Sequence, residues 1–527
     1  MKRLIFHTVF LISIAFTSFA QLSQPYRYER KQKNSDDYFH VISLKEQGLA
    51  LFREREKYKN NNKVWELILL DTMLQEKKSV EFEIKDRNKM VGYEITTTHI
   101  HLLYRTGETT KNDFELVSIN LNGVEEDRHT IKSELDFKLT HFILATQSLV
   151  LGGYVNKEPA IVMYDMSTKH VKVVPGFFQK DTELVDLRLN QNNTFNVVLV
   201  DRSNREDRTL LFKTFDASGE LLLEDFVPIE ERKSLQTGIT STLEGDDLII
   251  LGNWGERNSK NSLGFYALTV DPFQDQKINF VAFGTLTHYL DYLKPKRAHR
   301  IIENTKSELA AGRNPKFVNS VMPYKIVEYK GGFLLLAEIH SSVNNSSANY
   351  YSNPYYSSNP YYYNPYGFYP YGLGTYPGSS RLYRPYPYSS TKQNNDVTIH
   401  ETVLISFDAR GNVVWDQSLV LDDVKVESTE QVSDFNMEND KITFLYKKES
   451  ELKYKKIDKS EETALEQTEK IKTNDPMDEI RSERDSDGFV RQWYGNSFFV
   501  WGYQTIRNIK SEDRVREVFY INKVVAN

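Results

Sequence analysis

The amino-acid sequence predicts an all-β fold built from eight repeated units of four strands each. At 527 residues the chain is too long for one ordinary domain, unless that domain is a closed array of repeats. Strand-like runs fill most of it, because β-branched and aromatic residues alternate with polar ones and turn residues follow about every ten positions. Apolar residues make up 39% of the chain and charged residues 27%, so most of it is able to bury a core.

The repeated unit is recognised by a pair of apolar strands. A very apolar strand, a polar turn and a second apolar strand ending in Asp or Asn recur along the chain, as in SLVLGGYVNKEPAIVMYD (148–165). The first strands of the eight pairs begin near Gly48, His99, Ser148, Phe195, Asp247, Gly331, Lys441 and Asn496. A more polar strand precedes each pair and a short amphipathic strand follows it, which gives four strands at a spacing of roughly 50 residues.

Four-stranded units at this period resemble the blades of a β-propeller, whose radial packing buries a continuous core. The resemblance covers nearly all of residues 21–527 and implies eight blades; seven blades and a side hairpin are the alternative. It is architectural, since the GH…WD repeat, a regular Trp docking motif and the Asp-box SxDxGxTW are all missing from the sequence. The last unit holds only three strands, so we expect residues 24–32 to pair near 515–524 and complete the eighth blade.

The first 20 residues have the pattern of a secretory signal peptide. Two positive residues precede an apolar run over residues 4–16, and Ser18-Phe19-Ala20 forms a small-x-small cleavage site before Gln21. The apolar run is shorter than the roughly 20 residues that a membrane span needs. We therefore expect an exported protein with no transmembrane segment in the mature chain.

The composition limits which compartments and which partners we expect for the protein. The chain has no cysteine, which excludes disulfides, thiolate metal sites and a lipid anchor on cysteine, and favours bacterial export to the periplasm or the outside. The net charge is −6 with both signs interspersed, unlike the basic face of a nucleic-acid-binding protein. We expect an extracytoplasmic protein or glycan as the partner, with no nucleic acid and no cofactor.

A helical insertion is predicted over residues 285–312. Leu286, Tyr289, Leu290 and Leu293 have helical spacing and predict a first helix that Pro295 ends or kinks. The segment KRAHRIIENTKSELAAG (296–312) predicts a second helix that stops at its final glycine. Its basic residues are candidates for docking an acidic partner or an anionic glycan, the alternative being a solvated face: Lys294, Lys296, Arg297, His299 and Arg300.

A Tyr/Pro/Asn-rich loop is predicted over residues 341–395, between the two apolar strands of the sixth unit. Its prolines interrupt regular structure and its tyrosines provide rigid amphipathic contact surface. The alternative is a low-complexity expansion without a ligand. The candidate binding residues are Tyr355, Tyr356, Tyr361, Tyr362, Tyr363, Tyr366, Phe368, Tyr369 and Tyr371.

The sequence assigns no catalytic residue and no metal ligand. It has no Gly-rich phosphate loop and no GxSxG elbow. His99 and His101 share one face of a strand, and His340 and His400 flank the Tyr-rich loop, but neither pair predicts a third ligand. Charges on the expected channel strands are scattered: Glu94, Asp186, Arg188, Asp434 and Arg491. The sequence therefore favours a binding or scaffolding module; the alternative is a glycan hydrolase or lyase with an active site at one end of the channel.

Overall fold

The computed structural model describes residues 22–526 apart from 34–35, 107–112, 124, 133, 205–206, 242–247, 258, 260, 272–275, 343–380, 383–396, 427–430, 439 and 459–465. The expected signal peptide, residues 1–20, and all of the tyrosines and the phenylalanine proposed for binding lie outside the described residues.

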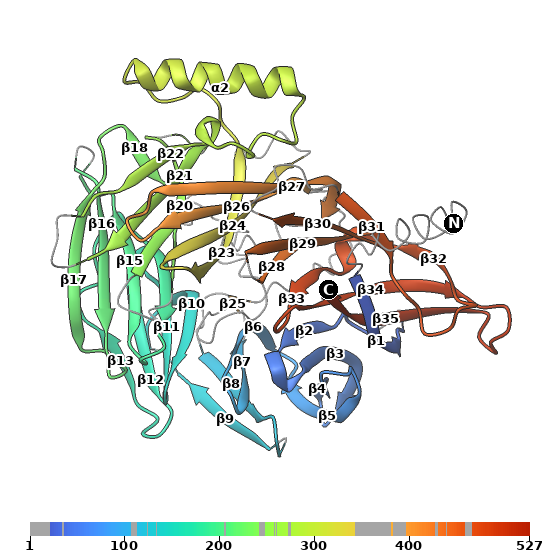
Figure 1. Ribbon diagram of the computed structural model, residues 1–527. Coiled ribbons are helices and arrows are strands. Elements are labelled where there is room, and N and C mark those ends of the chain that lie inside the picture. Colours follow the sequence, from blue (N-terminus) through green and yellow to red (C-terminus); the bar gives the residue numbers. More distant parts are fainter. Residues whose placement is uncertain are drawn as a thin grey trace, which may run out of the picture. The chain divides into compact units, whose positions relative to one another are not determined.

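The fold is an eight-bladed β-propeller, as the sequence predicts, and its eight sheets are antiparallel (Figure 1). The first sheet holds β2 (His40–Ser43), β3 (Leu49–Lys59), β4 (Asn62–Leu70) and β5 (Glu76–Lys85). The second holds β25 (Arg381–Leu382), β6 (Asn88–Ile95), β7 (His99–Thr106), β8 (Asp113–Asn120) and β9 (Glu126–Ile131). The third holds β10 (Phe137–Ala145), β11 (Ser148–Val155), β12 (Glu158–Asp165) and β13 (Val171–Val174).

The remaining sheets follow the same order along the chain. The fourth holds β14 (Thr182–Leu189), β15 (Phe195–Asp201), β16 (Thr209–Phe215) and β17 (Leu221–Pro228). The fifth holds β18 (Lys233–Leu235), β19 (Ile239–Thr240), β20 (Leu248–Glu256), β21 (Ser262–Val270) and β22 (Asn279–Ala282). The sixth holds β23 (Ser320–Tyr329), β24 (Gly332–Ser342), β26 (Val397–Asp408) and β27 (Val413–Val426). The seventh holds β28 (Ser433–Glu438), β29 (Lys441–Lys448), β30 (Glu451–Asp458) and β31 (Glu466–Lys470). The eighth holds β1 (Leu22–Lys31), β35 (Val515–Ala526), β34 (Ser497–Arg507), β33 (Val490–Gln492) and β32 (Glu479–Glu483).

The eight apolar hairpins begin where the sequence predicts them or one residue later. β7, β11, β15 and β29 begin at the predicted residues, and β3, β20, β24 and β34 begin one residue after them. Two of the four later starts follow a glycine in the left-handed region, Gly48 at φ 121° and Gly331 at φ 72°, which belong to the turn rather than to the strand. The repeat period of the sequence therefore sets the blades.

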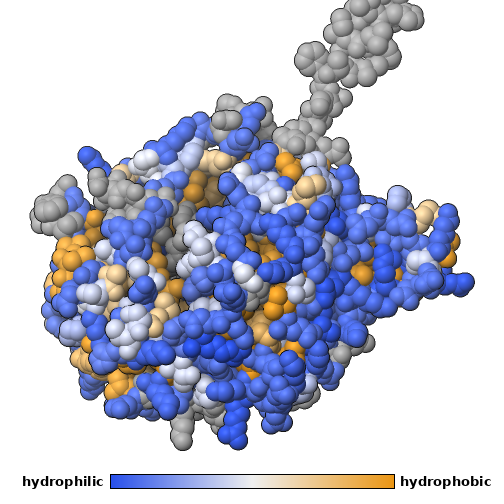
Figure 2. All heavy atoms as spheres, turned by 90° about the horizontal axis from the view of Figure 1, so that it is seen from below, coloured by the Kyte–Doolittle hydropathy of each residue, from blue (hydrophilic) through white to orange (hydrophobic). Residues whose placement is uncertain are grey.

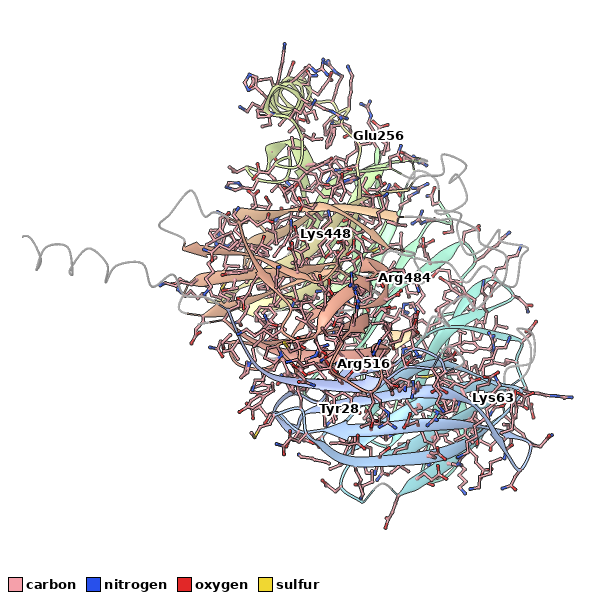
Figure 3. The ribbon with its side chains drawn as sticks, turned by 90° about the vertical axis from the view of Figure 1, so that its right-hand side faces the viewer. Tyr28, Lys63, Glu256, Lys448, Arg484 and Arg516 are labelled. Carbon is pink, nitrogen blue, oxygen red and sulfur yellow. The ribbon has the colours of Figure 1, made fainter. Side chains whose placement is uncertain are left out.

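The predicted pairing of the N-terminal strand is confirmed. β1 is antiparallel to β35, with register from Leu22 opposite Ala526 to Lys31 opposite Val518. The guanidinium of Arg27 in β1 donates to Asn522 Oδ1 and to Gln504 Oε1, both at 2.9 Å, and so ties three strands together. Figure 3 labels Tyr28 of β1 and Arg516 of β35 in this sheet. β1 thus supplies the outer strand that the C-terminal unit lacks.

Backbone contacts divide the chain into two compact units, residues 1–51 with 68–78 and 432–527, and residues 52–67 with 79–431. In the larger unit, apolar side chains of successive sheets form the core: Leu116 with Leu149, Ile161 with Leu199, and Val200 with Ile250 lie in shared clusters. In the smaller unit, Leu445 and Phe498 share a cluster in the same way. The apolar strands of each sheet are therefore buried between neighbouring blades, as the radial packing of a propeller requires.

The insertion after β22 holds one α-helix among its described residues, α2 (Pro295–Ala310), preceded by the 3₁₀ turn η2 (Phe283–Thr285). The expected first helix at 286–293 is wrong, because these residues form turns. Their apolar side chains are buried all the same: Tyr289 stacks on Phe283 with ring centroids 4.3 Å apart. Lys294 is extended at ψ 138°, as the residue before a proline prefers, so Pro295 begins a helix instead of ending one.

The outer strands are mostly polar, but some of them expose apolar side chains. Figure 2 shows a largely hydrophilic face with hydrophobic side chains gathered toward its left-hand edge. Among the outer strands, β17 exposes Leu221, Leu222 and Phe226 by 50%, 59% and 56%. Two other short 3₁₀ turns, η1 (Lys45–Gln47) and η4 (Asp485–Asp487), complete the described helical elements.

Candidate functional site

The helix α2 is attached to the fifth and sixth blades by one apolar face. Ala298, Ile301 and Ile302 pack against the buried cluster that contains Phe283 and Leu286. One turn further along, Thr305 is buried against Gly284 of η2, where an added Cβ would lie 2.3 Å from the Thr305 hydroxyl oxygen. The backbone of η2 therefore approaches the helix closely, and only glycine permits that approach.

The other side of α2 carries the predicted basic residues. Lys296, Arg297 and Arg300 are exposed, and no ion pair or hydrogen bond joins their side chains to any described residue. Lys294 and His299 are exposed beside them. The structure thus brings these cations together in the first half of the helix, and we call them the cationic end of α2.

Acidic partners are concentrated at the opposite end of the helix. Lys306 pairs with Glu303 at 3.1 Å, while Arg313 and Lys316 both reach Glu308, at 2.5 and 2.7 Å. Arg313 and then Lys316 lower the pKa of the Glu308 carboxyl to about 2. The positive charges at this end are therefore neutralised, in contrast to those at the cationic end.

The order of charges along α2 opposes the helix dipole. The first turn has no acidic residue and the last turn has no basic residue. A helix N-terminus carries partial positive charge, and each badly placed charge costs about 0.3–1 kcal/mol. The cations at this end therefore lower the stability of the helix.

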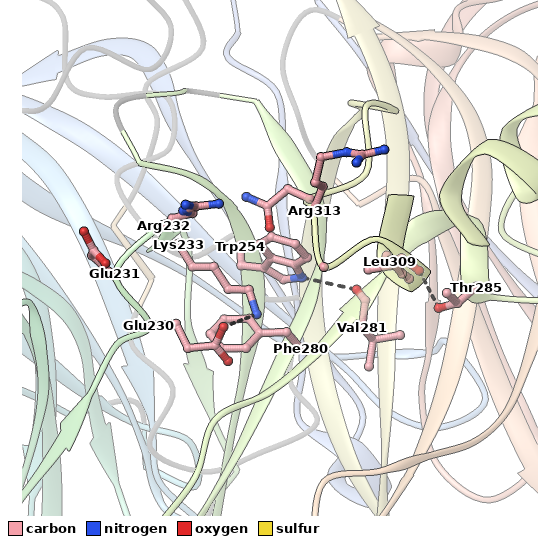
Figure 4. Close-up of a pocket in the computed structure, with 13 residues that line it drawn as sticks. Glu230, Glu231, Arg232, Lys233, Trp254, Phe280, Val281, Thr285, Leu309 and Arg313 are labelled. Atoms are coloured by element: carbon pink, nitrogen blue, oxygen red, sulfur yellow. Dashed lines mark hydrogen bonds and ion pairs between the residues drawn. The ribbon is translucent and has the colours of Figure 1, made fainter. Parts of the chain in front are cut away.

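A pocket of about 580 Å³ lies beside the C-terminal end of α2. Figure 4 shows Lys233 between the carboxylate of Glu230 and the rings of Trp254 and Phe280. Its ammonium is 2.6 Å from Glu230 Oε2, 3.9 Å from the Phe280 ring centroid and 5.2 Å from that of Trp254. Leu309 and Arg313 of the insertion face it across the opening. The pocket combines aromatic surface with charges of both signs.

No pattern in the sequence predicts this pocket. Lys233, Trp254 and Phe280 come from three different strands, and nothing in their local spacing joins them. The pocket is also distinct from the cationic end, since a helix of 16 residues places its two ends about 24 Å apart. The basic residues that the sequence singled out therefore do not line it.

Two of the charged channel residues join successive blades. Asp186 in β14 accepts from the backbone N–H and the hydroxyl of Thr240 in β19, at 2.8 and 2.5 Å. Asp434 in β28 accepts from the backbone N–H of Gln492 in β33 at 2.9 Å. Both carboxylates are buried, and the same bond recurs in both units of the chain. Their role is structural in each case.

The other three channel charges are also buried. Arg188 lies 3.5 Å from Asp186, Arg491 donates to the carbonyl of Val490 at 2.6 Å, and Glu94 lies opposite His101 in the ladder between β6 and β7. These side chains therefore belong to the packed interior of their sheets.

The histidines form no metal site in the described residues, where no three His, Asp or Glu side chains converge. His101 binds Ser118 Oγ through Nδ1 at 2.7 Å and stacks on His99, and burial lowers its pKa to about 4. His340 lies opposite Ile399 in the ladder, with His400 next to it at the register slip, and burial and then the nearby His400 lower the pKa of His340 to about 4.

Two short parts of the predicted Tyr-rich loop, residues 341–395, are described, since Ser341 and Ser342 still belong to β24. Its residues Arg381 and Leu382 form β25, which pairs with Tyr93 and Gly92 at the edge of β6. The insertion thereby adds a fifth strand to the second sheet.

The fold and these features define a β-propeller with a helical insertion. No protein-family model and no curated protein matches the chain. Among described residues, no helix has the length and apolar character needed to cross a membrane.

Solved structures similar to this chain include a polysaccharide lyase, the β-propeller domain of a protease and an oligopeptidase. The polysaccharide lyase Uly1 is 8% identical with a TM-score of 0.37, over 93% of this chain and 100% of that chain. The β-propeller domain of the Trilobed protease from Pyrococcus furiosus is 10% identical with a TM-score of 0.32, over 84% and 96%. Prolyl oligopeptidase B from Galerina marginata is 10% identical with a TM-score of 0.32, over 57% of this chain and 39% of that chain. Identities and TM-scores as low as these say nothing about the activity of this chain.

Proposed function

We propose that this protein is an exported β-propeller scaffold that binds an anionic extracytoplasmic protein or glycan through the cationic end of α2. The observation that carries the proposal is the group of exposed cations, Lys296, Arg297 and Arg300, which have no acidic partner among the described residues. In this proposal residues 1–20 direct export to the periplasm or the outside.

Electrostatics supports an anionic partner. The whole chain has a net charge of −6, so the cationic end is a local exception on an acidic protein. Such a patch attracts a polyanion and orients its approach. The placement of the cations at the positive end of the helix dipole strengthens the local field that an anion would meet.

The Tyr-rich loop supplies a second contact surface in this proposal. Tyrosine rings stack on sugars and on other aromatic side chains, and their hydroxyls form hydrogen bonds. The pairing of Arg381 and Leu382 with β6 supports a contact between this insertion and the second blade.

The alternative, a glycan hydrolase or lyase at one end of the channel, has less support. Glycoside hydrolysis needs two carboxyl groups facing the scissile bond. Asp186 and Asp434 are two of the charged residues on the expected channel strands. Their carboxylates already accept hydrogen bonds from backbone N–H groups of the next blade.

The test uses the mature chain and a sulfated dextran as the polyanion. Replacing Lys296, Arg297 and Arg300 together by alanine is expected to weaken binding at least tenfold and to reduce its salt dependence. The matched control is the pair Lys306→Ala and Lys316→Ala on the neutralised end of the insertion, which should bind nearly as the parent does. Equal loss in both variants, or no loss in the first, would contradict the proposal.

A further inference from the structure

His400 makes two hydrogen bonds in the order of a Ser-His-Asp triad. Its Nε2 lies 2.7 Å from the hydroxyl oxygen of Ser341, and its Nδ1 lies 2.7 Å from Asp423 Oδ1. In the tautomer that satisfies both contacts, Nδ1–H donates to the carboxylate and Nε2 accepts from the hydroxyl. This is the arrangement in which an imidazole activates a serine as a nucleophile.

Three neighbouring strands of the sixth blade supply the three residues. Ser341 is near the end of β24, His400 is in the central strand β26, and Asp423 is in β27. Neighbouring strands of a sheet are about 4.8 Å apart, so side chains from three successive strands reach one another only when they lie at matching positions.

Register slips on both sides of His400 create that match. Between β24 and β26 the ladder passes from Ile339 opposite Glu401 to His340 opposite Ile399, so His400 is left out of it. Between β26 and β27 it passes from Glu401 opposite Val420 to Ile399 opposite Val424, so residues 421–423 stand opposite His400. Bulges of this kind redirect side chains and recur next to active sites.

The local backbone and packing hold the arrangement. Asp423 adopts φ 47°, a left-handed conformation that is uncommon for residues with a side chain. The ring of Tyr292 stacks on His400 with centroids 5.7 Å apart and planes at 16°, and Asn319 fixes the Tyr292 hydroxyl by a bond of 2.9 Å. The imidazole is therefore held by ring stacking on one face and by a hydrogen bond at each nitrogen.

We propose that Ser341 is the nucleophile of an acyl-transfer site that accepts carboxylic esters, with His400 as its general base and Asp423 as the positioning residue. Ser341 Oγ attacks the ester carbonyl carbon while its proton moves to His400 Nε2. The bond to the alcohol then breaks, and the departing oxygen takes this proton. Water repeats the two steps on the acyl-serine, releasing the carboxylic acid and restoring Ser341.

The exposure of the site selects esters as the substrate class. Ser341 is exposed, and the side chain of Asp423 is 73% exposed while that of His400 is 23% exposed. Charge developing on the carbonyl oxygen in water is stabilised less than in a closed site. Amides have poorer leaving groups than esters, so the ester is the substrate that such a site can cleave. This activity is independent of the proposed binding function.

The first experiment treats the mature chain with a fluorophosphonate, which modifies activated serines, and maps the adduct by mass spectrometry. We expect modification at Ser341 that disappears in Ser341→Ala and falls at least tenfold in His400→Gln. Ser218 is the internal control, because its hydroxyl binds the Asp216 carboxylate at 2.8 Å without an imidazole. Absence of modification at Ser341, or equal modification of Ser218, would overturn the proposal.

A second pair of variants tests the positioning residue. In Asp423→Asn the amide donates to Nδ1, so Nε2 carries the proton and no longer accepts from Ser341. We expect labelling and the hydrolysis of 4-nitrophenyl acetate to fall as far as in His400→Gln, with partial recovery in Asp423→Glu. If Asp423→Asn labels as fast as the parent while thermal unfolding is unchanged, Asp423 does not position the base and the proposal is wrong.

Discussion

Asp186 and Thr240 join the fourth and fifth blades through two hydrogen bonds to a single carboxylate oxygen, from the backbone N–H at 2.8 Å and from the hydroxyl at 2.5 Å. Asp186 is 1% exposed and Thr240 is 1% exposed, so water cannot replace either bond. A similar bond joins the carboxylate of Asp434 to the backbone N–H of Gln492. A buried aspartate on an inner strand therefore joins successive blades at two places.

Removing this carboxylate should destabilise the propeller. Asp186→Ala leaves the two donors of Thr240 unpaired and removes a partner of Arg188, so we expect a loss of about 3 kcal/mol in the free energy of unfolding. Urea unfolding followed by tryptophan fluorescence measures it. Glu231→Ala, at an exposed carboxylate, serves as the control and should change the free energy of unfolding by less than about 0.5 kcal/mol. A loss no larger than the control's would show that the bond is dispensable.

The contact between Gly284 and Thr305 gives a prediction for the insertion. A Cβ at position 284 would meet the Thr305 hydroxyl at 2.3 Å, so Gly284→Ala should push α2 away from the sheets at a cost of about 1–3 kcal/mol. We expect faster proteolytic cleavage near residues 295–310. Gly123→Ala is the control, since the nearest atom to its added Cβ is 3.6 Å away. Unchanged cleavage in Gly284→Ala would mean that the helix and η2 adjust freely.

Buried histidines should make the protein sensitive to acid. Burial lowers the pKa of His141 and of His340 to about 4, whereas the unfolded chain binds a proton near 6.5. Between these values only the unfolded state is protonated, so stability is fully present above pH 6.5 and falls by about 1.4 kcal/mol per histidine per pH unit down to about pH 4.

The histidine prediction is measured by urea unfolding between pH 7.5 and pH 5. His141→Gln should be less stable than the parent at pH 7.5 but lose less stability on acidification, because the side chain at position 141 no longer takes up a proton when the chain unfolds. Parallel pH curves for the parent and His141→Gln would show that this histidine does not titrate as the burial argument requires.

The charge order of α2 predicts opposite effects on stability and on binding. Lys296→Glu together with Arg297→Glu places acidic residues in the first turn, where each favourable charge contributes about 0.3–1 kcal/mol. We expect a melting temperature that stays the same or rises, while binding to sulfated dextran is lost. A fall in the melting temperature would mean that the cations support the fold. Retained binding would mean that α2 is not the contact surface.

The Tyr-rich loop should be dispensable for folding. Replacing residues 343–394 by Gly-Asn shortens the connection between β24 and β26, and each halving of a loop lowers its closure cost by about 0.6 kcal/mol. The variant also loses β25, which is only two residues long. We expect cooperative unfolding at an unchanged or higher temperature, and weaker glycan binding. Loss of the folded state would instead make the pairing of β25 with β6 essential.

The sequence by itself determined the blades and their closure. Alternating apolar and polar residues, bounded by turns, are local properties of the chain, so the starts of the eight apolar hairpins could be predicted to within one residue. The pairing of residues 24–32 with the C-terminal strand followed from counting strands, because an unpaired edge in the last unit is unfavourable. The segment that forms α2 was likewise recognisable from its composition and its terminal glycine.

Only the tertiary structure decided which side chains from distant segments of the chain come into contact. Residues 286–293 have helical spacing, yet they form turns whose apolar side chains pack into the buried cluster around Phe283. The carboxylate of Asp416, far along the chain, accepts from the N–H groups of Thr287 and His288 at 2.9 and 2.6 Å. The approach of Ser341, His400 and Asp423 depends on two register slips, and the pocket around Lys233 depends on three strands. Register sets which side chains meet across a sheet, and it is fixed by bulges and packing that a local sequence pattern does not record.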